Sequence, residues 1–492
     1  MKLTYLIVAS LLASVVNIQA DSPAASADDA LVDGLVQEGL LSHAQADRIR
    51  EKVDEAEAQT PSSKIALSDA VQKLTFYGDG RLRFDSATQH NHYAAPVVND
   101  RERYRLRLGA DYQYADNLKA GFELESGTTD DSANQTFGST FTKASINVGK
   151  IYLRWDPTDW LGLEAGKFTN PWYTTTDMVY SFDLNPEGGA ELLNFHPTDN
   201  LTVGFNAVQY IYVNANESTT TEGINNSDTF IICNQLPVTW KITKDLTFKI
   251  APGFTFYTGG GNTNYDGGIP TNPTTSGTVG TPPGGSQTVT VSPGTGNSSI
   301  DPVFVSPKEA DDLAVFSAPG EFNFLLAGVN MRPYWDFEWN TEGKKRIQDV
   351  YLDPTASAPT VGTAAGVASQ NRALGDNLAW ALGLQVGQNK KKGDWSGLIE
   401  FRQIGLGAVD QNINGTDYAD SYANQQGFKL STAYNFTDFL TGTVTFYDTW
   451  DYKKGLYQSL GGAAATPATG TTQYLVSAKS VQRVQVDLGW KF

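Results

Sequence analysis

The chain has 492 residues with a formal net charge of −18 at pH 7, and 11% of its residues are Phe, Trp or Tyr. So acidic a chain argues against nucleic acid as a partner, because phosphate contacts need a basic surface. The single cysteine, Cys233, excludes an internal disulfide framework.

Residues 1–20 have the pattern of a secretory signal peptide, with Lys2 near the start, an apolar run from Leu6 to Val16, and Ala20 before the expected cleavage site. The apolar run is too short to cross a membrane as a helix, and no later run approaches the ~20 apolar residues that such a helix needs. We therefore expect an exported protein that is either soluble in the cell envelope or a β-barrel.

Residues 21–72 are expected to form a helical periplasmic extension and a linker. Leu31, Leu35 and Val36 are spaced for one face of a helix, and Ser42–Gln45 has the pattern of a capping box that begins a second helix. Two interpretations stay open. In the first, the helices dock on the periplasmic side or help the chain to oligomerise. In the second, they are a solvated linker.

From Leu74 onward the hydrophobic period changes to two. Between Tyr104 and Tyr114, for example, apolar or aromatic residues alternate with Arg, Asp and Gln. Runs of about ten such residues have the length that a tilted strand needs to cross a bilayer. The segment 73–492 therefore predicts an all-β domain, an antiparallel transmembrane β-barrel.

Short turns alternate with long polar segments throughout this domain. The short turns are expected at 115–117, 156–160, 196–200, 243–245, 325–329, 389–394 and 435–438. The long segments are expected at 85–100, 127–143, 170–188, 214–227, 258–312, 341–376, 404–424 and 449–475, with 258–312 as the longest external loop. A soluble sandwich would not segregate its loops by length in this way, whereas barrels do. The connections predict about sixteen strands.

The last nine residues alternate with the same period of two. One face of this strand carries the apolar side chains Val484, Val486, Leu488, Trp490 and Phe492. The pattern resembles the terminal strand of bacterial outer-membrane β-barrels, whose final Phe is read by the assembly machinery. An amphipathic edge strand of a soluble protein is the alternative. In a barrel this strand must pair with the one at 74–84 to close the sheet.

Aromatic residues are expected in two belts at the headgroup levels of the membrane. The belt near the short turns contains Tyr112, Tyr114, Trp155, Trp160, Trp240, Phe436, Phe439 and Phe492. The opposite belt contains Phe84, Tyr104, Phe168, Trp172, Tyr257, Trp339 and Tyr447.

Several segments resemble the bacterial "putative porin" family of outer-membrane barrels. The most specific are Gly166–Tyr173 and Asp183–Gly188, and the resemblance also includes Gly80–Arg83 and Arg103–Gly109. The long loop 258–312 departs from the family pattern. The resemblance implies a barrel and, by inference, a diffusion pore in the outer membrane of a Gram-negative cell. It supplies no catalytic residues, and it implies a homotrimer by analogy only.

A barrel of about sixteen strands leaves a water-filled lumen, so its inward side chains become the functional surface. The expected pore-lining residues are Arg81, Arg83, Arg103, Arg105, Arg107, Lys119, Glu123 and Glu125. Two interpretations stay open for this basic strip. It faces acidic groups across the pore and creates a transverse field that selects solutes, or its charges only satisfy one another across strands.

The segment 170–188 is the candidate for a constriction loop that folds into the pore. It carries the acidic residues Asp177, Asp183 and Glu187, and Pro and Gly residues that shape its bends. An ordinary external loop is the alternative interpretation.

No enzyme is expected, and neither a cofactor nor a metal. The pair His90 and His92 lacks acidic or Cys partners at a supporting spacing, and His196 lies in a short turn outside any nucleophile motif. Cys233 falls on the polar side of its strand, where it is read as a tolerated neutral residue.

The sequence thus predicts an outer-membrane porin, a water-filled channel for passive diffusion of small hydrophilic solutes and ions. The alternatives are a substrate-selective channel for oligosaccharides or anions, a non-conducting surface barrel whose loops bind partners, and a soluble periplasmic β protein. The expected partners are outer-membrane lipid, the barrel-assembly machinery and small hydrophilic solutes.

Overall fold

The computed structural model describes residues 73–91, 96–127, 132–138, 143–213, 229–258, 277–280, 286–289, 313–346, 376–411, 413–453 and 478–492. The chain separates into two units, Met1–Gln72 and Lys73–Phe492. The expected signal peptide and helical extension lie in the first unit, outside the described residues. Everything below concerns the second unit.

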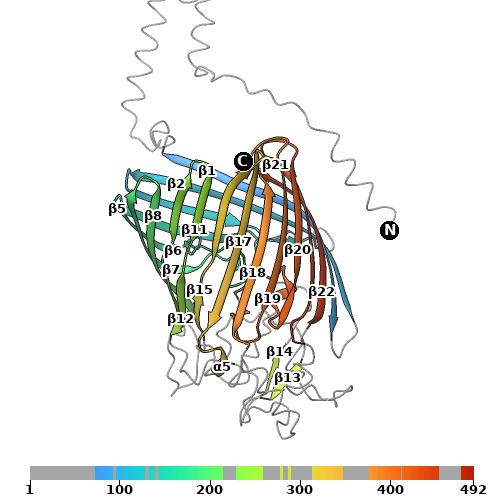
Figure 1. Cartoon of the computed structure of the whole chain (residues 1–492). Coiled ribbons are helices and arrows are strands. Elements are labelled where there is room, and N and C mark those ends of the chain that lie inside the picture. Colours follow the sequence, from blue (N-terminus) through green and yellow to red (C-terminus); the bar gives the residue numbers. More distant parts are fainter. Residues whose placement is uncertain are drawn as a thin grey trace, which may run out of the picture. The chain divides into compact units, whose positions relative to one another are not determined.

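The second unit is a closed antiparallel β-barrel (Figure 1). Its strands are β1 (Leu74–Asn91), β2 (Val97–Ala115), β3 (Leu118–Glu125), β4 (Gln135–Thr136), β5 (Asn147–Thr158), β6 (Leu161–Lys167), β7 (Glu187–Thr198), β8 (Leu201–Val213), β9 (Thr229–Gln235), β10 (Val238–Thr243), β11 (Leu246–Ile250), β12 (Gly253–Thr258), β15 (Ala314–Ser317), β16 (Gly320–Leu326), β17 (Val329–Asn340), β18 (Leu378–Gly387), β19 (Trp395–Ile404), β20 (Gln425–Asn435), β21 (Leu440–Asp451) and β22 (Ala478–Lys491). Outside this sheet lie a hairpin of β13 (Gly277–Gly280) and β14 (Ser286–Val289), the helix α5 (Gly343–Arg346) and the 3-10 turn η5 (Ala419–Ser421).

Three of the barrel strands are interrupted at a proline. Pro237 separates β9 from β10, Pro252 separates β11 from β12, and Pro319 separates β15 from β16. Proline lacks the N–H that a ladder needs, so each break is local. The breaks are neighbours, because Leu236 N–H donates to Pro252 O at 2.8 Å and Ala251 N–H donates to Pro319 O at 3.0 Å. With each pair counted as one strand, and the two-residue β4 set aside, the described barrel has sixteen strands, as predicted.

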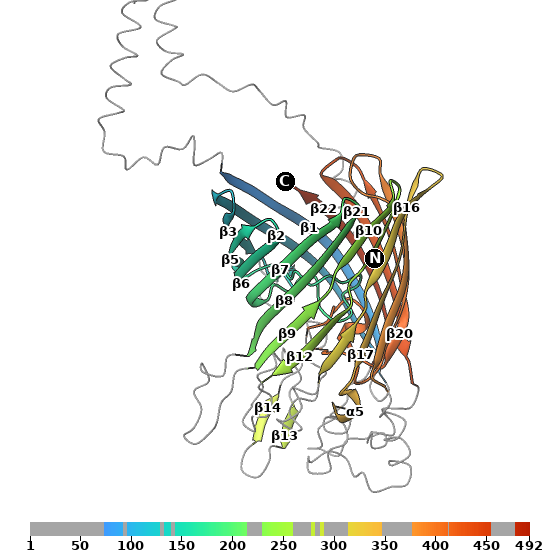
Figure 2. The same ribbon diagram turned by 60° about the vertical axis from the view of Figure 1, so that its left-hand side comes forward.

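The tight turns and the strand ends that lead into the long connections lie at opposite ends of the barrel. The tight turns are at the end where β22 finishes, and α5, β13 and β14 are at the other end (Figures 1 and 2). All seven turns expected from the sequence join consecutive strands. The expected loop at 85–100 is wrong in its bounds, because β1 continues to Asn91 and β2 begins at Val97. The alternation of polar and apolar residues is weaker there, so the sequence pattern predicted strand ends that lie too far from the loop.

The barrel is apolar outside and polar inside. Large apolar side chains are exposed on alternate strand positions, among them Phe76, Ile151 and Leu382. Ionic side chains such as Asp85, Arg402 and Arg483 are buried in the interior. This distribution suits a barrel surrounded by lipid with a polar lumen. No helix among the described residues is both long enough and apolar enough to cross a membrane.

The pairing of β1 with β22 closes the sheet, as the terminal strand predicted. Phe492 N–H donates to Gly78 O at 3.1 Å, and Gly78 N–H donates to Phe492 O at 3.0 Å. The rings of Phe492 and Trp490 lie directly over Gly78 and Gly80, where a Cβ atom would come within 2.6 and 2.2 Å of them. Glycine at these two positions therefore lets the terminal aromatic rings cover the seam.

The two aromatic belts are only partly formed as predicted. At the end with the short turns, Tyr114, Trp155, Trp160, Trp240, Phe436, Phe439 and Phe492 are exposed on the outer surface. In the opposite set, Phe84 and Trp339 are exposed, but Phe168, Trp172, Tyr257 and Tyr447 are buried inside the barrel. The sequence assigned these four rings to the wrong surface. Phe168 and Trp172 belong to a loop that enters the lumen, and Tyr257 and Tyr447 pack against residues of such loops.

Candidate functional site

The connection between β6 and β7, residues 168–186, crosses the lumen. Its base is closed by the N–H of Phe168, which donates to Pro186 O at 3.1 Å. Thr175 Oγ1 donates to Trp335 O at 2.7 Å, and Thr176 Oγ1 donates to Asp336 at 2.8 Å. This segment, called the crossing loop below, therefore docks on β17, far around the wall from the strands that carry it.

Two acidic residues of the crossing loop continue these contacts to other parts of the wall. Asp177 pairs with Arg402 of β19 at 2.8 Å. Asp183 pairs with Arg105 of β2 at 3.2 Å. The crossing loop thus carries negative charge to two separate parts of the wall. Glu187 lies apart from them, since it begins β7 and pairs with Lys167 at 3.0 Å with a largely exposed side chain.

A second internal loop, residues 405–424 between β19 and β20, packs beside the crossing loop. Gly415 N–H donates to Asp177 O, and Ser181 N–H donates to Ile413 O, both at 2.7 Å. Toward β8, Tyr212 donates a hydrogen bond to Asp410 at 2.7 Å. On the opposite side, Asp417 pairs with Arg83 at 3.2 Å and with Arg483 at 3.6 Å. The residues of this loop, called the inner loop below, are almost all buried.

Apolar side chains fill the part of the lumen between these loops and β7, β8, β9, β12 and β15. The cluster there contains Phe168, Trp172, Ala190, Leu192, Val208, Tyr210, Ile231, Cys233, Tyr257, Leu313, Val315 and Ile413. A second cluster joins both loops to β18, β19 and β21 and contains Met178, Ala379, Ile404, Leu406, Ala408, Val409, Tyr418, Ala419, Ala423 and Tyr447. Water-filled space is therefore concentrated toward β1, β2 and β20–β22.

The packed part of the lumen can be tested through Cys233, whose thiol is buried and lies 3.5 Å from Thr255 Oγ1. We expect a water-soluble maleimide to label this thiol at least tenfold more slowly in the folded barrel than in denatured protein, because exposure controls thiol reactivity. Labelling followed by mass spectrometry measures both rates. Equal rates would show that this side of the lumen is open to water.

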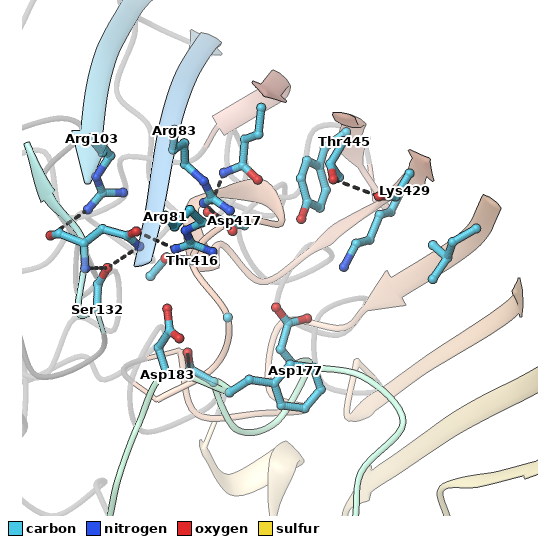
Figure 3. A pocket seen from close by; sticks show the side chains of 18 of the residues that line it. Arg81, Arg83, Arg103, Ser132, Asp177, Asp183, Thr416, Asp417, Lys429 and Thr445 are labelled. Carbon is cyan, nitrogen blue, oxygen red and sulfur yellow. Dashed lines mark hydrogen bonds and ion pairs between the residues drawn. The ribbon is translucent and has the colours of Figure 1, made fainter. Parts of the chain in front are cut away.

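A polar cavity of about 370 Å³ lies between the two loops and the wall. Arg81 and Arg83 of β1, Arg103 of β2 and Lys429 of β20 line it together with the loop carboxylates Asp177, Asp183 and Asp417 (Figure 3). Neutral donors and acceptors complete the lining, namely Ser132, Asn134, Ser181, Gln385, Ser396, Thr416, Ser431, Thr445 and Gln485. A small hydrophilic solute would find hydrogen-bonding groups on every side.

The arginines of the predicted basic strip lie on the inner face of the wall. They make both kinds of contact that the sequence left open, with carboxylates on neighbouring strands and with loop carboxylates across the lumen. Across strands, Arg105 and Arg107 both pair with Asp79, at 2.5 and 2.6 Å. Across the lumen, Arg105 also reaches Asp183, and Arg83 reaches Asp417.

Of the predicted pore-lining residues, three line the cavity, namely Arg81, Arg83 and Arg103. The others do not, namely Arg105, Arg107, Lys119, Glu123 and Glu125. Lys119 pairs with Asp111 at 3.2 Å, and Glu123 pairs with Lys150 at 3.1 Å. Glu125 lies half-buried opposite Arg107 in the sheet.

The carboxylates of Asp177 and Asp417 remain ionised over a wide pH range. Burial raises the pKa of Asp417, but the guanidinium groups of Arg83 and Arg483 outweigh burial and hold that pKa well below its usual range. Burial likewise raises the pKa of Asp177, and Arg402 and Lys429 bring it below its usual value. Both loops therefore keep their ionic contacts with the wall at neutral and mildly acidic pH.

Sequence reasoning missed the inner loop, which was expected to be external. It also missed the cations that hold the two loops, Arg402 and Arg483, and the cavity residue Lys429. A signal was present in Ile404–Val409, where Ile, Leu, Ala and Val are interrupted only by Gly. So apolar a stretch is unusual for a loop exposed to water, and it is buried in the structure. Over the described ranges, no group of three or more His, Cys, Asp or Glu side chains could hold a metal ion.

Comparisons with solved structures give three outer-membrane proteins of low sequence identity. OmpF of Salmonella typhi in complex with daunomycin shares 10% identity, covers 85% of this chain and 97% of its own, and has a TM-score of 0.42. OprB of Pseudomonas putida at high pH shares 11% identity over 86% and 96% of the two chains, with a TM-score of 0.45. A loop-deletion mutant of OmpT from Vibrio cholerae shares 10% identity over 85% and 100%, with a TM-score of 0.39.

No curated protein matches the chain. Residues 77–260 match the family described as "Putative porin". The matched segment runs from β1 to β12 and includes the crossing loop, and the remaining strands continue the same closed sheet. A closed barrel with an apolar exterior and a polar cavity is the architecture that a porin of the outer membrane requires. This chain is therefore similar to the "Putative porin" family over residues 77–260, and its fold is that of an outer-membrane channel.

Proposed function

We propose that this protein is a porin for the passive diffusion of small hydrophilic solutes and ions, in which the crossing loop and the inner loop narrow the path. The cavity lined by Arg81, Arg103, Asp177, Asp417 and Lys429 carries this proposal. Its lining is mostly polar, with Phe182 and Leu398 as the apolar members, whereas apolar clusters fill the rest of the lumen near the loops.

The contacts of the crossing loop support a role as the constriction. Its ends join β6 and β7, while its middle contacts β17 and β19 and its later part contacts β2. A solute that passes through the lumen must therefore pass beside Asp177 and Asp183. Among the described residues that line the cavity, no group is arranged as a nucleophile with a general base, so we propose a non-enzymatic channel.

Single-channel recording in planar bilayers with neutral solutes of increasing size tests this function. We expect stepwise, ohmic conductance that falls when glycerol or small sugars are added, because solutes that enter the pore displace conducting electrolyte. Polyethylene glycols too large for the cavity should leave the conductance unchanged. Folded barrel that gives no conductance steps would contradict the proposal and favour a surface barrel whose loops bind partners.

A further inference from the structure

Each carboxylate that lines the cavity already forms an ion pair with an arginine. Asp177 pairs with Arg402 at 2.8 Å, Asp183 with Arg105 at 3.2 Å and Asp417 with Arg83 at 3.2 Å. A cation that enters the cavity would have to compete with a guanidinium group at each of these sites. Such competition is costly, because the arginines that would lose a partner are themselves largely buried.

Three cations of the cavity differ from this pattern. Within the described ranges, Arg81, Arg103 and Lys429 have no carboxylate oxygen within 4.0 Å. Arg81 and Arg103 donate to neutral oxygens of Asn134, the latter at 3.4 Å, and Lys429 Nζ lies 5.5 Å from the ring centre of Tyr447. The Nε atoms of Arg81 and Arg103 are buried without a hydrogen-bond partner. Buried donors of this kind are costly unless a ligand satisfies them.

The three cations approach the cavity from different sides. In Figure 3, Arg81 and Arg103 extend from β1 and β2, and Lys429 extends from β20 on the other side of Asp417. An oxyanion inside the cavity could accept hydrogen bonds from the guanidinium groups, whose planar forks suit carboxylate and phosphate oxygens. Lys429 would add a mobile point charge from the other side.

We propose that Arg81, Arg103 and Lys429 form a binding site for small oxyanion-bearing solutes inside the pore. This inference rests on the proposed channel function and specifies its substrate class. The cavity lining carries four cationic and three acidic side chains, so its net charge is small. The site acts through short-range hydrogen bonds and favours anions over cations modestly rather than exclusively.

Inorganic phosphate and acetate are the probes for this site, measured in two ways on the full chain. In planar bilayers, each is added to a chloride solution and the chloride current is recorded. By calorimetry, each is titrated into the detergent-solubilised barrel, which needs no conductance. We expect saturable block and saturable binding, and the stronger probe identifies whether phosphate or carboxylate groups suit the site better.

The variants Arg81→Gln, Arg103→Gln and Lys429→Gln remove one cation each. We expect each to weaken the probe affinity about tenfold, the loss typical of one hydrogen bond to a charged group. Lys119→Gln is the matched control, because Lys119 is a wall cation paired with Asp111 that does not line the cavity. It should leave the affinity unchanged.

The outcomes separate this site from the channel function. Conductance without probe binding, or equal losses in Lys119→Gln and the three site variants, would refute the site and leave the channel intact. The opposite outcome is a barrel that gives no conductance but binds the probes, with weaker binding in the three variants. It would support the site and refute the channel.

Discussion

Replacing Arg402 with Met is expected to release both internal loops and to raise the single-channel conductance. The guanidinium group of Arg402 is fully buried, pairs with Asp177 at 2.8 Å and with Glu400 at 2.6 Å, and lies over the ring of Tyr418. Removing it leaves the buried carboxylate of Glu400 and the partly buried carboxylate of Asp177 without their paired guanidinium group. Breaking a buried ion pair by removing one partner costs about 3–5 kcal/mol. The lost free energy destabilises the docking of the two loops rather than the barrel, because the strands of the barrel are held by their own backbone hydrogen bonds.

The conductance of the Arg402→Met channel should be larger and noisier than that of the wild type. Protease cleavage within the two loops should also become faster, because a released loop is accessible. Arg154→Met is the control. Arg154 likewise has two carboxylate partners, Asp156 at 2.8 Å and Glu164 at 3.5 Å, but these lie on the wall and its turn and contact neither loop. Unchanged conductance and protease resistance in Arg402→Met would show that Arg402 does not hold the loops.

Deleting Phe492 is expected to reduce strongly the amount of folded protein in the outer membrane. The deletion removes both backbone hydrogen bonds between Phe492 and Gly78 and uncovers the seam between β1 and β22. We propose that the terminal strand, with Val484, Val486, Leu488, Trp490 and Phe492 on its outer face, also presents the signal read by the barrel-assembly machinery. Channels that do assemble should keep the wild-type conductance, because Phe492 does not line the cavity.

Two substitutions separate the contributions to this effect. Phe492→Ala keeps the backbone hydrogen bonds and removes only the ring over Gly78, so it reports on the ring alone. Phe439→Ala removes another exposed aromatic ring from the same rim of the barrel and serves as the control. Folded protein is measured by its retarded unfolding in detergent gels. If the Phe492 deletion assembled to the wild-type level, neither the seam nor the sorting role would depend on this residue.

The sequence by itself determined the barrel. An alternation of period two, as from Tyr104 to Tyr114, reports which side of a strand faces lipid, and this depends only on residues close together in the chain. The same local information located all seven tight turns and the closing pair of strands, β1 and β22. The prolines at 237, 252 and 319 are also local signals, and they explain the strand breaks once the strands are aligned.

The tertiary structure alone decided which long connections enter the lumen and which cations lack a carboxylate partner within 4.0 Å among the described residues. The sequence could not choose between an external loop and a constriction for 170–188, because the contact of Asp177 with Arg402 joins residues far apart in the chain. The inner loop was missed for the same reason. The sequence pattern does not distinguish the arginines of the basic strip. In the structure Arg83 pairs with Asp417, whereas Arg81 and Arg103 have no carboxylate oxygen within 4.0 Å among the described residues. Pairing depends on where the loops dock, and docking is set by packing between distant segments that no periodicity encodes.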